Sequence, residues 1–152
     1  MSDERDLVIT RLIAASHAAV YRCWSDPALM VRWFELGQFK AVRADLDVRP
    51  GGASMVVMRA PGGEEFANCD TYLEVVPGER LVFTDAYTSG WEPSDKPFMT
   101  VVVTFADEAG QTRFTLRFRH WTAEDRDAHA AMDFDARWEA AIDALAALAA
   151  TV

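Results

Sequence analysis

The sequence lacks the short motifs that identify most metal and nucleotide enzymes. It contains no glycine-rich phosphate loop, no nucleotide-binding fingerprint and no Gly-x-Ser-x-Gly turn that would present a nucleophilic serine. There is no Cys-x-x-Cys pair, and the three histidines, His17, His120 and His129, do not have the spacing of metal ligands. These absences argue against metal or nucleotide chemistry, and we expect neither a metal nor a cofactor.

Long apolar runs and net positive charge are absent as well. No apolar stretch reaches about 18 residues, the length that a membrane-spanning helix requires. The N-terminal MSDERDLV lacks the apolar core of a signal peptide. The formal net charge of −9 repels phosphate backbones and anionic lipids. The sequence therefore predicts a cytoplasmic protein that binds neither nucleic acid nor membranes.

Cysteine is scarce, whereas apolar residues are not. The two cysteines, Cys23 and Cys69, each lie within an apolar pattern, which predicts buried, reduced thiols of the kind found in the cytoplasm. Hydrophobic residues make up 51% of the chain and charged residues 26%, which is typical of a globular protein. With 152 residues the chain is long enough for a sizeable core, and we predict a single domain over 1–152.

The N-terminal part predicts one strand followed by two short helices. Residues 7–13 are β-prone and alternate loosely, as in a strand. Ser16 is placed to cap a short helix that runs through Trp24. The Asp26-Pro27 pair has the pattern of an N-cap followed by proline at the first helical position, so it opens a second short helix.

From about residue 38 the hydrophobic period changes to two, which indicates β-strands. The breaks between them contain turn residues, such as Pro50-Gly51-Gly52, and such short links join antiparallel neighbours. The one longer break spans 88–97. The predicted strands lie at about 39–48, 53–60, 65–76, 80–88, 98–106 and 111–121.

The C-terminal segment predicts a long helix, and that helix decides the fold class. Thr122 caps it, and a helix over 123–150 would be about 42 Å long, with a bend allowed near Asp133. In the last strand, apolar residues occupy one face and arginines the other, so one face of the sheet is covered. We predict an α+β helix-grip fold, in which a curved antiparallel sheet of about six to seven strands wraps round the C-terminal helix.

Several segments follow one another in an order that is typical of a known family. They are VITRLIAASHAAVYRCWSDPALMVRWF near the N-terminus, VRPGGASMVVMRAPGG, YLEVVPGERLVFT and the final stretch from Trp138 to Leu148. In these segments, which span almost the whole chain, the sequence resembles the activator-of-heat-shock-protein-90-ATPase homologue family. It departs from the usual pattern at Ser16, where proline is common, and at Arg137, where glycine is common.

This resemblance implies a fold and a range of functions. The wider superfamily, which includes START-domain and birch-pollen-allergen proteins, implies a helix-grip fold with a deep apolar cavity. Its members include lipid carriers, hormone receptors, polyketide cyclases and co-chaperone domains that act in the stress response. Since one fold supports many functions, the site has to be argued from its own residues.

Alternation along the strands predicts which side chains enter such a cavity. Phe83, Asp85 and Tyr87 share the inner face of one strand, and His120 follows Phe118 inward on another. Asp85 and His120 either orient a polar group of a ligand or act as a general acid–base pair. The structural alternatives are that Asp85 accepts a hydrogen bond from a loop amide and that His120 packs at the following turn.

We predict that ten residues line the ligand site. Their aromatic rings would supply contact area, and the two polar side chains would give orientation. They are Trp33, Phe34, Phe83, Asp85, Tyr87, Trp91, Phe118, His120, Phe134 and Trp138.

Two further predictions concern the 88–97 loop and the outer face of the last strand. Trp91 is in the 88–97 loop, where it either folds down as a lid or contacts a partner. The arginines at 113, 117 and 119 form a solvated strand face, which we expect to pair across strands with Asp70 and Glu74.

Three functional hypotheses remain. The first is a carrier or sensor that binds a small apolar molecule between the sheet and the C-terminal helix. The second is a co-chaperone-like interaction module that stimulates a heat-shock ATPase, and the third is a cyclase- or hydrolase-type enzyme that uses Asp85 and His120. The sequence favours binding over catalysis, and it leaves open whether the protein is a monomer or a homodimer.

Overall fold

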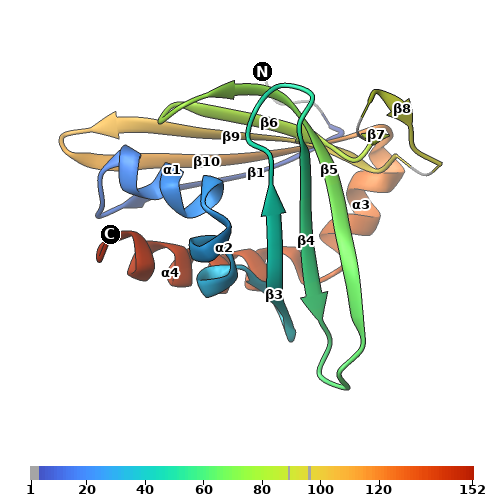
Figure 1. Ribbon diagram of the computed structural model, residues 1–152, viewed down its shortest axis with the longest axis horizontal. Helices are drawn as coiled ribbons and strands as arrows, with labels where there is room; N and C mark the ends of the chain where they lie inside the picture. The colour runs from blue at the N-terminus through green and yellow to red at the C-terminus, as the bar shows by residue number, and fades with distance from the viewer. Residues whose placement is uncertain (1–3, 89, 96) are drawn as a thin grey trace.

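The computed structural model describes residues 4–88, 90–95 and 97–152, and it has the predicted α+β helix-grip architecture (Figure 1). An eight-stranded antiparallel sheet runs in the order β1-β10-β9-β6-β5-β4-β3-β2. Its strands are β1 (Asp6–Ile13), β2 (Glu35–Leu36), β3 (Phe39–Leu46), β4 (Ala53–Arg59), β5 (Glu65–Val76), β6 (Arg80–Thr84), β9 (Met99–Glu108) and β10 (Gln111–His120). A separate two-stranded hairpin consists of β7 (Tyr87–Thr88) and β8 (Glu92–Pro93).

The two short N-terminal helices are capped as the sequence predicts. Helix α1 (His17–Ser25) begins after Ser16, whose Oγ accepts a hydrogen bond from the amide of Ala19 at 3.2 Å. Helix α2 (Pro27–Trp33) begins after Asp26, whose carboxylate accepts from the amide of Ala28 at 2.9 Å. Proline at the first position of α2 does not interrupt its hydrogen bonds, because that amide has no partner within a helix. Both caps are therefore confirmed.

The C-terminal segment forms two helices rather than one continuous helix. Helix α3 (Ala123–Ala130) is followed by α4 (Phe134–Ala149), and Asp133 between them has a left-handed φ of 56°. The chain therefore breaks where a bend was allowed. Helix α4 packs over the inner face of the sheet, with Phe134, Trp138, Ile142 and Leu145 buried. Its 16 residues span about 24 Å, shorter than the predicted 42 Å.

The core is an aromatic cluster shared by the helices and the sheet. Trp24 of α1 packs on Trp33 of α2, with ring centroids 5.0 Å apart. Trp138 of α4 contacts Phe34 at 6.0 Å and Phe118 of β10 at 5.3 Å. The helices are thus held on the sheet by ring-to-ring contacts, which contribute energy beyond the burial of apolar area.

The predicted pairing of the arginines on β10 is wrong. They do not pair with Asp70 and Glu74: Arg113 pairs with Glu108, and both Arg117 and Arg119 pair with the buried Asp6. The reason is the strand order, since β10 lies between β1 and β9 and is not next to β5.

Cys23 is buried as predicted, but Cys69 is exposed. Cys69 belongs to β5, where it alternates with the inward-facing Asn68 and Asp70 and so points to the outer face. Among the described residues, no helix covers that face at this strand (Figure 1).

A pair of histidines joins α3 to the sheet. His120 Nδ1 lies 2.8 Å from the carbonyl oxygen of Arg5, which can only accept, so this nitrogen carries the proton. In the neutral ring His120 Nε2 is then an acceptor, and it receives a hydrogen bond from Nδ1 of His129 at 2.9 Å. Burial, and to a smaller extent the nearby His120, lower the pKa of His129 from 6.5 to about 4.

This lowered pKa predicts that the fold is destabilised by acid. Between pH 6.5 and about pH 4 the unfolded chain takes up a proton at residue 129 that the folded chain does not, so the free energy of unfolding decreases as the pH falls through this window. In His129→Gln the amide can still donate to His120, but this proton uptake is lost. Urea unfolding at a series of pH values should show a smaller decrease for His129→Gln than for the unmodified protein. Equal decreases would contradict the assignment, and His17→Gln, on α1, serves as the control.

Candidate functional site

A cavity of about 260 Å³ lies between the inner face of the sheet and helices α1, α2 and α4. Its wall is mostly apolar, with aliphatic and methionine side chains between aromatic rings. The aromatic residues that line it are Trp24, Phe34, Tyr72, Phe83, Phe118 and Trp138. A mostly apolar concavity with a few polar groups is the usual form of a small-molecule site.

Five of the ten predicted residues line this cavity. Phe83 and Asp85 reach it from β6 and the residue after it, and Phe118 reaches it from β10. Phe34 and Trp138 close the side opposite the sheet, from the end of α2 and from α4. The structure therefore brings these five residues together round one space.

Trp33 and Phe134 do not line the cavity, because each is part of the packed core. Trp33 is 1% exposed, and its indole Nε1 donates to the carbonyl of Cys23 at 2.8 Å. Phe134 packs against Phe118, with ring centroids 5.2 Å apart. Trp24 of α1, which is not among the ten predicted residues, lines the cavity instead.

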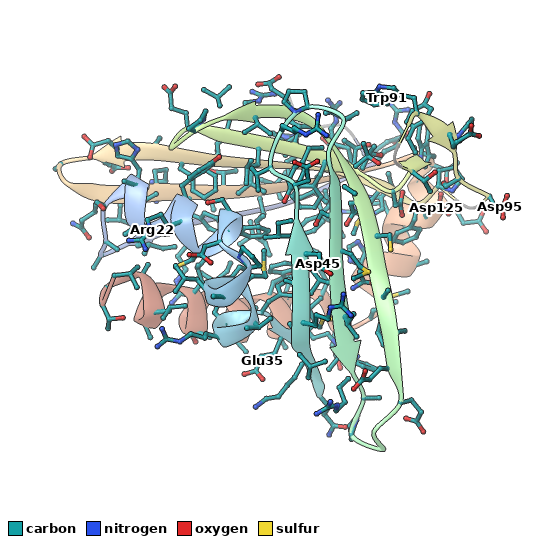
Figure 2. All side chains as sticks on the ribbon, in the orientation of Figure 1. Arg22, Glu35, Asp45, Trp91, Asp95 and Asp125 are labelled. Carbon is teal, nitrogen blue, oxygen red and sulfur yellow. The ribbon has the colours of Figure 1, made fainter. Side chains whose placement is uncertain are left out.

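Tyr87 and Trp91 lie on the other face of the sheet and do not form a lid. Thr71 alternates with the inward-facing Asp70 and Tyr72, so it points outward, and its hydroxyl donates to the carbonyl of Tyr87 at 2.8 Å. Trp91 packs on Tyr87 and remains 52% exposed. Figure 2 shows Trp91 beside the β7–β8 hairpin, away from α1. The alternation failed here because β6 ends at Thr84.

His120 lies on the inner face but outside the cavity. Its two ring nitrogens are occupied by Arg5 and His129, and Phe98 packs on its ring at 5.3 Å. Within the described residues no hydrogen bond joins it to Asp85. The packing alternative therefore describes His120, and the predicted acid–base pair is not assembled.

Asp85 serves both the fold and the cavity wall. Its Oδ1 accepts hydrogen bonds from the amides of Phe98 and Met99, at 2.8 and 3.1 Å. This is the loop-amide contact that the sequence left as an alternative. The carboxylate also faces the cavity, so it is held in a fixed orientation there.

Asp70 lines the cavity although the sequence analysis placed it on the outer face of the sheet. It lines the cavity from β5, and extending the pairing of Thr71 with Thr84 by one residue places it opposite Asp85. Burial, and then the negative charge of Asp85, raise the pKa of Asp70 to about 7. Its position two residues before Tyr72, a large aromatic residue, could have predicted that Asp70 faces inward, because residues two apart in a strand share a face.

Tyr72 and Asn68 complete the polar part of the wall. Burial raises the pKa of Tyr72 to about 12, against a smaller opposing effect of its hydrogen bond with Ser54, so its hydroxyl keeps its proton. Asn68 faces inward in the alternation of β5 yet is exposed, so the cavity opens to solvent beside it.

Two further observations concern metals and membranes. The described residues contain no group of three or more His, Cys, Asp or Glu side chains that could hold a metal ion. Among them, no helix is both long and apolar enough to cross a bilayer.

Comparisons with known proteins agree with this architecture. The family model described as Activator of Hsp90 ATPase homolog 1-like protein matches residues 14–150. A solved structure from Nitrosomonas europaea is 31% identical, with a TM-score of 0.92 over 97% of this chain and 96% of that one. One from Mycobacterium smegmatis is 28% identical, with a TM-score of 0.79 over 96% and 91%.

A third solved structure has a related name. It is an AHSA1-like protein from Aeromonas hydrophila, 22% identical, with a TM-score of 0.72 over 96% of this chain and 92% of that one, and it supports the fold alone. No curated protein matches the sequence.

The raised pKa of Asp70 predicts a gain of stability on its replacement. The folded pKa is about 7, above the ordinary 3.8, so the folded chain binds the extra proton between these values and stability is lost as the pH rises through 7. Asp70→Asn removes this ionisation. It should raise the free energy of unfolding relative to the unmodified protein more at pH 8 than at pH 5, in urea unfolding followed by circular dichroism. A pH-independent difference would contradict the placement, and Asp95→Asn, on an exposed loop, is the control.

Proposed function

Because the chain belongs to the family of Activator of Hsp90 ATPase homolog 1-like proteins, we propose that it binds one small hydrophobic molecule in the cavity between its sheet and α4, as a carrier or a sensor. The observation that carries this proposal is the cavity itself. Its 260 Å³ corresponds to roughly nine water molecules at about 30 Å³ each, which suits a small aromatic molecule.

The composition of the wall supports an apolar ligand. Six aromatic side chains converge on the cavity from α1, the end of α2, α4 and the strands β5, β6 and β10. They are held by the packing that forms the core, so the site is preformed and little conformational entropy is lost on binding. Burying roughly 200 Å² of ligand surface would contribute about 5 kcal/mol, which corresponds to a dissociation constant of about 0.2 mM.

Binding of a neutral aromatic hydrocarbon tests this function. Isothermal titration calorimetry with 2-methylnaphthalene should give one site per chain. Val101→Phe fills the cavity from β9 and should weaken binding at least about tenfold. Val42→Phe, at an exposed position of β3, is the matched control and should bind like the unmodified protein.

Two results would count against the proposed function. The first is a lack of binding by the unmodified protein, and the second is undiminished binding by a Val101→Phe variant with a normal circular dichroism spectrum.

A second candidate function rests on the outer surface. The β7–β8 hairpin exposes Tyr87 and Trp91 on the face opposite the cavity, and exposed aromatic residues are frequent at protein interfaces. This arrangement favours a co-chaperone-like interaction module that stimulates a heat-shock ATPase. An increase in the ATPase rate of heat-shock protein 90 that is lost in Trp91→Ala would support it, and no change in rate on adding the protein would remove it.

A further inference from the structure

The charges in the cavity wall have one sign. Among the described residues, the titratable side chains that face the cavity are Asp70, Tyr72 and Asp85, and the lining includes no lysine, arginine or histidine. A ligand with a carboxylate or phosphate group would face two acidic side chains with no positive charge to compensate. The wall therefore discriminates against anions, because like charges in a poorly solvated space repel strongly.

The acidic oxygens that face the cavity are largely unpaired. Asp70 has no hydrogen bond or ion pair within the described residues, and Asp85 uses only Oδ1, for two backbone amides. A carboxylate that is withdrawn from water without a partner costs free energy. The raised pKa of Asp70 is the consequence of that burial and of the neighbouring charge of Asp85. A donor or a positive charge supplied from the cavity would remove the cost.

The aromatic rings are a second, independent feature that favours a positive charge. Six rings line the same space, among them Trp24, Tyr72 and Phe83. The face of an aromatic ring carries partial negative charge, so it attracts an ammonium group, most strongly where water is excluded. Rings and carboxylates together are complementary to an apolar body with one cationic group.

We propose that the cavity selects a small organic ammonium compound, whose aromatic or aliphatic body packs against the rings while its charged nitrogen lies between Asp70 and Asp85. This inference rests on the proposed function and names its ligand class. The nitrogen donates to Asp70 and to the free oxygen of Asp85, and the net charge of −9 favours the approach of cations.

Four probes that share one ring system test the selection. They are 2-methylnaphthalene, 2-naphthalenemethanol, 2-naphthylmethylamine and 2-naphthoate, titrated by calorimetry at pH 7.5. The amine should bind at least about tenfold more tightly than the hydrocarbon, and the carboxylate at least about tenfold more weakly, since one charge pair in such a site contributes about a factor of ten or more. The alcohol should lie between the hydrocarbon and the amine.

A matched pair of variants assigns the effect to the carboxylates. In Asp70→Asn the ratio of amine affinity to hydrocarbon affinity should fall about tenfold, whereas in Asp95→Asn, on an exposed loop, the ratio should not change. Because each variant is compared with itself on two ligands, a general loss of folded protein cannot imitate this result.

Proton release gives a second readout. Asp70 is partly protonated near neutral pH, so an ammonium group beside it should drive off a proton. Calorimetry at pH 7 in two buffers of different ionisation enthalpy should show proton release for the amine and none for the hydrocarbon.

The outcomes separate the ligand class from the function. If all four probes bind with the same affinity, the selection for ammonium is wrong and the hydrophobic site stands. If the alcohol or the carboxylate matches the amine, the selection is likewise wrong. If none of the four probes binds, both proposals fail.

Discussion

The packing of aromatic rings between the helices and the sheet is the constraint on which the rest of the structure depends. Trp24, Trp33, Phe34, Trp138 and Phe118 form a chain of contacts, with centroids 5.0 to 6.0 Å apart, that joins α1, α2 and α4 to β10. Large rigid rings that meet at interplanar angles of 50° to 82° hold the helices on the curved sheet without filling all of the space beneath them. The same contacts that stabilise the fold therefore leave the cavity open.

Much of the fold could be predicted from local signals. The caps at Ser16 and Asp26 depend only on residues within a few positions of each helix start. The alternation of apolar residues in the strands can likewise be recognised without knowing which strands pair. The inward direction of Phe83 and Phe118 followed from simple alternation. The break at Asp133 was harder to place, because no Gly or Pro marks it.

The cavity wall was harder to predict where an irregularity in strand pairing changes which side chains face inward. A β-bulge between Tyr72 and Glu74 adds one residue to β5 opposite β6. Asp70 and Glu74 are four residues apart, so in a regular strand their side chains would point to the same face. The bulge between them places the two side chains on opposite faces. Asp70 was therefore assigned to the outer surface. The choice between Trp24 and Trp33 as wall residues depends on how α1 and α2 are rotated against the sheet, which tertiary packing decides.

Asp70 has no hydrogen-bond partner among the described residues, so it is difficult to explain as part of an apolar core. It lowers stability relative to an apolar residue of similar size, because its burial is not compensated. Its position opposite Asp85 suits a site that recognises a ligand. The most direct measurement of the central claim is a crystal structure of the protein grown with 2-methylnaphthalene. We expect density for one molecule enclosed by Trp24, Phe83 and Trp138; a cavity closed by repacked side chains, with no ligand inside, would contradict it.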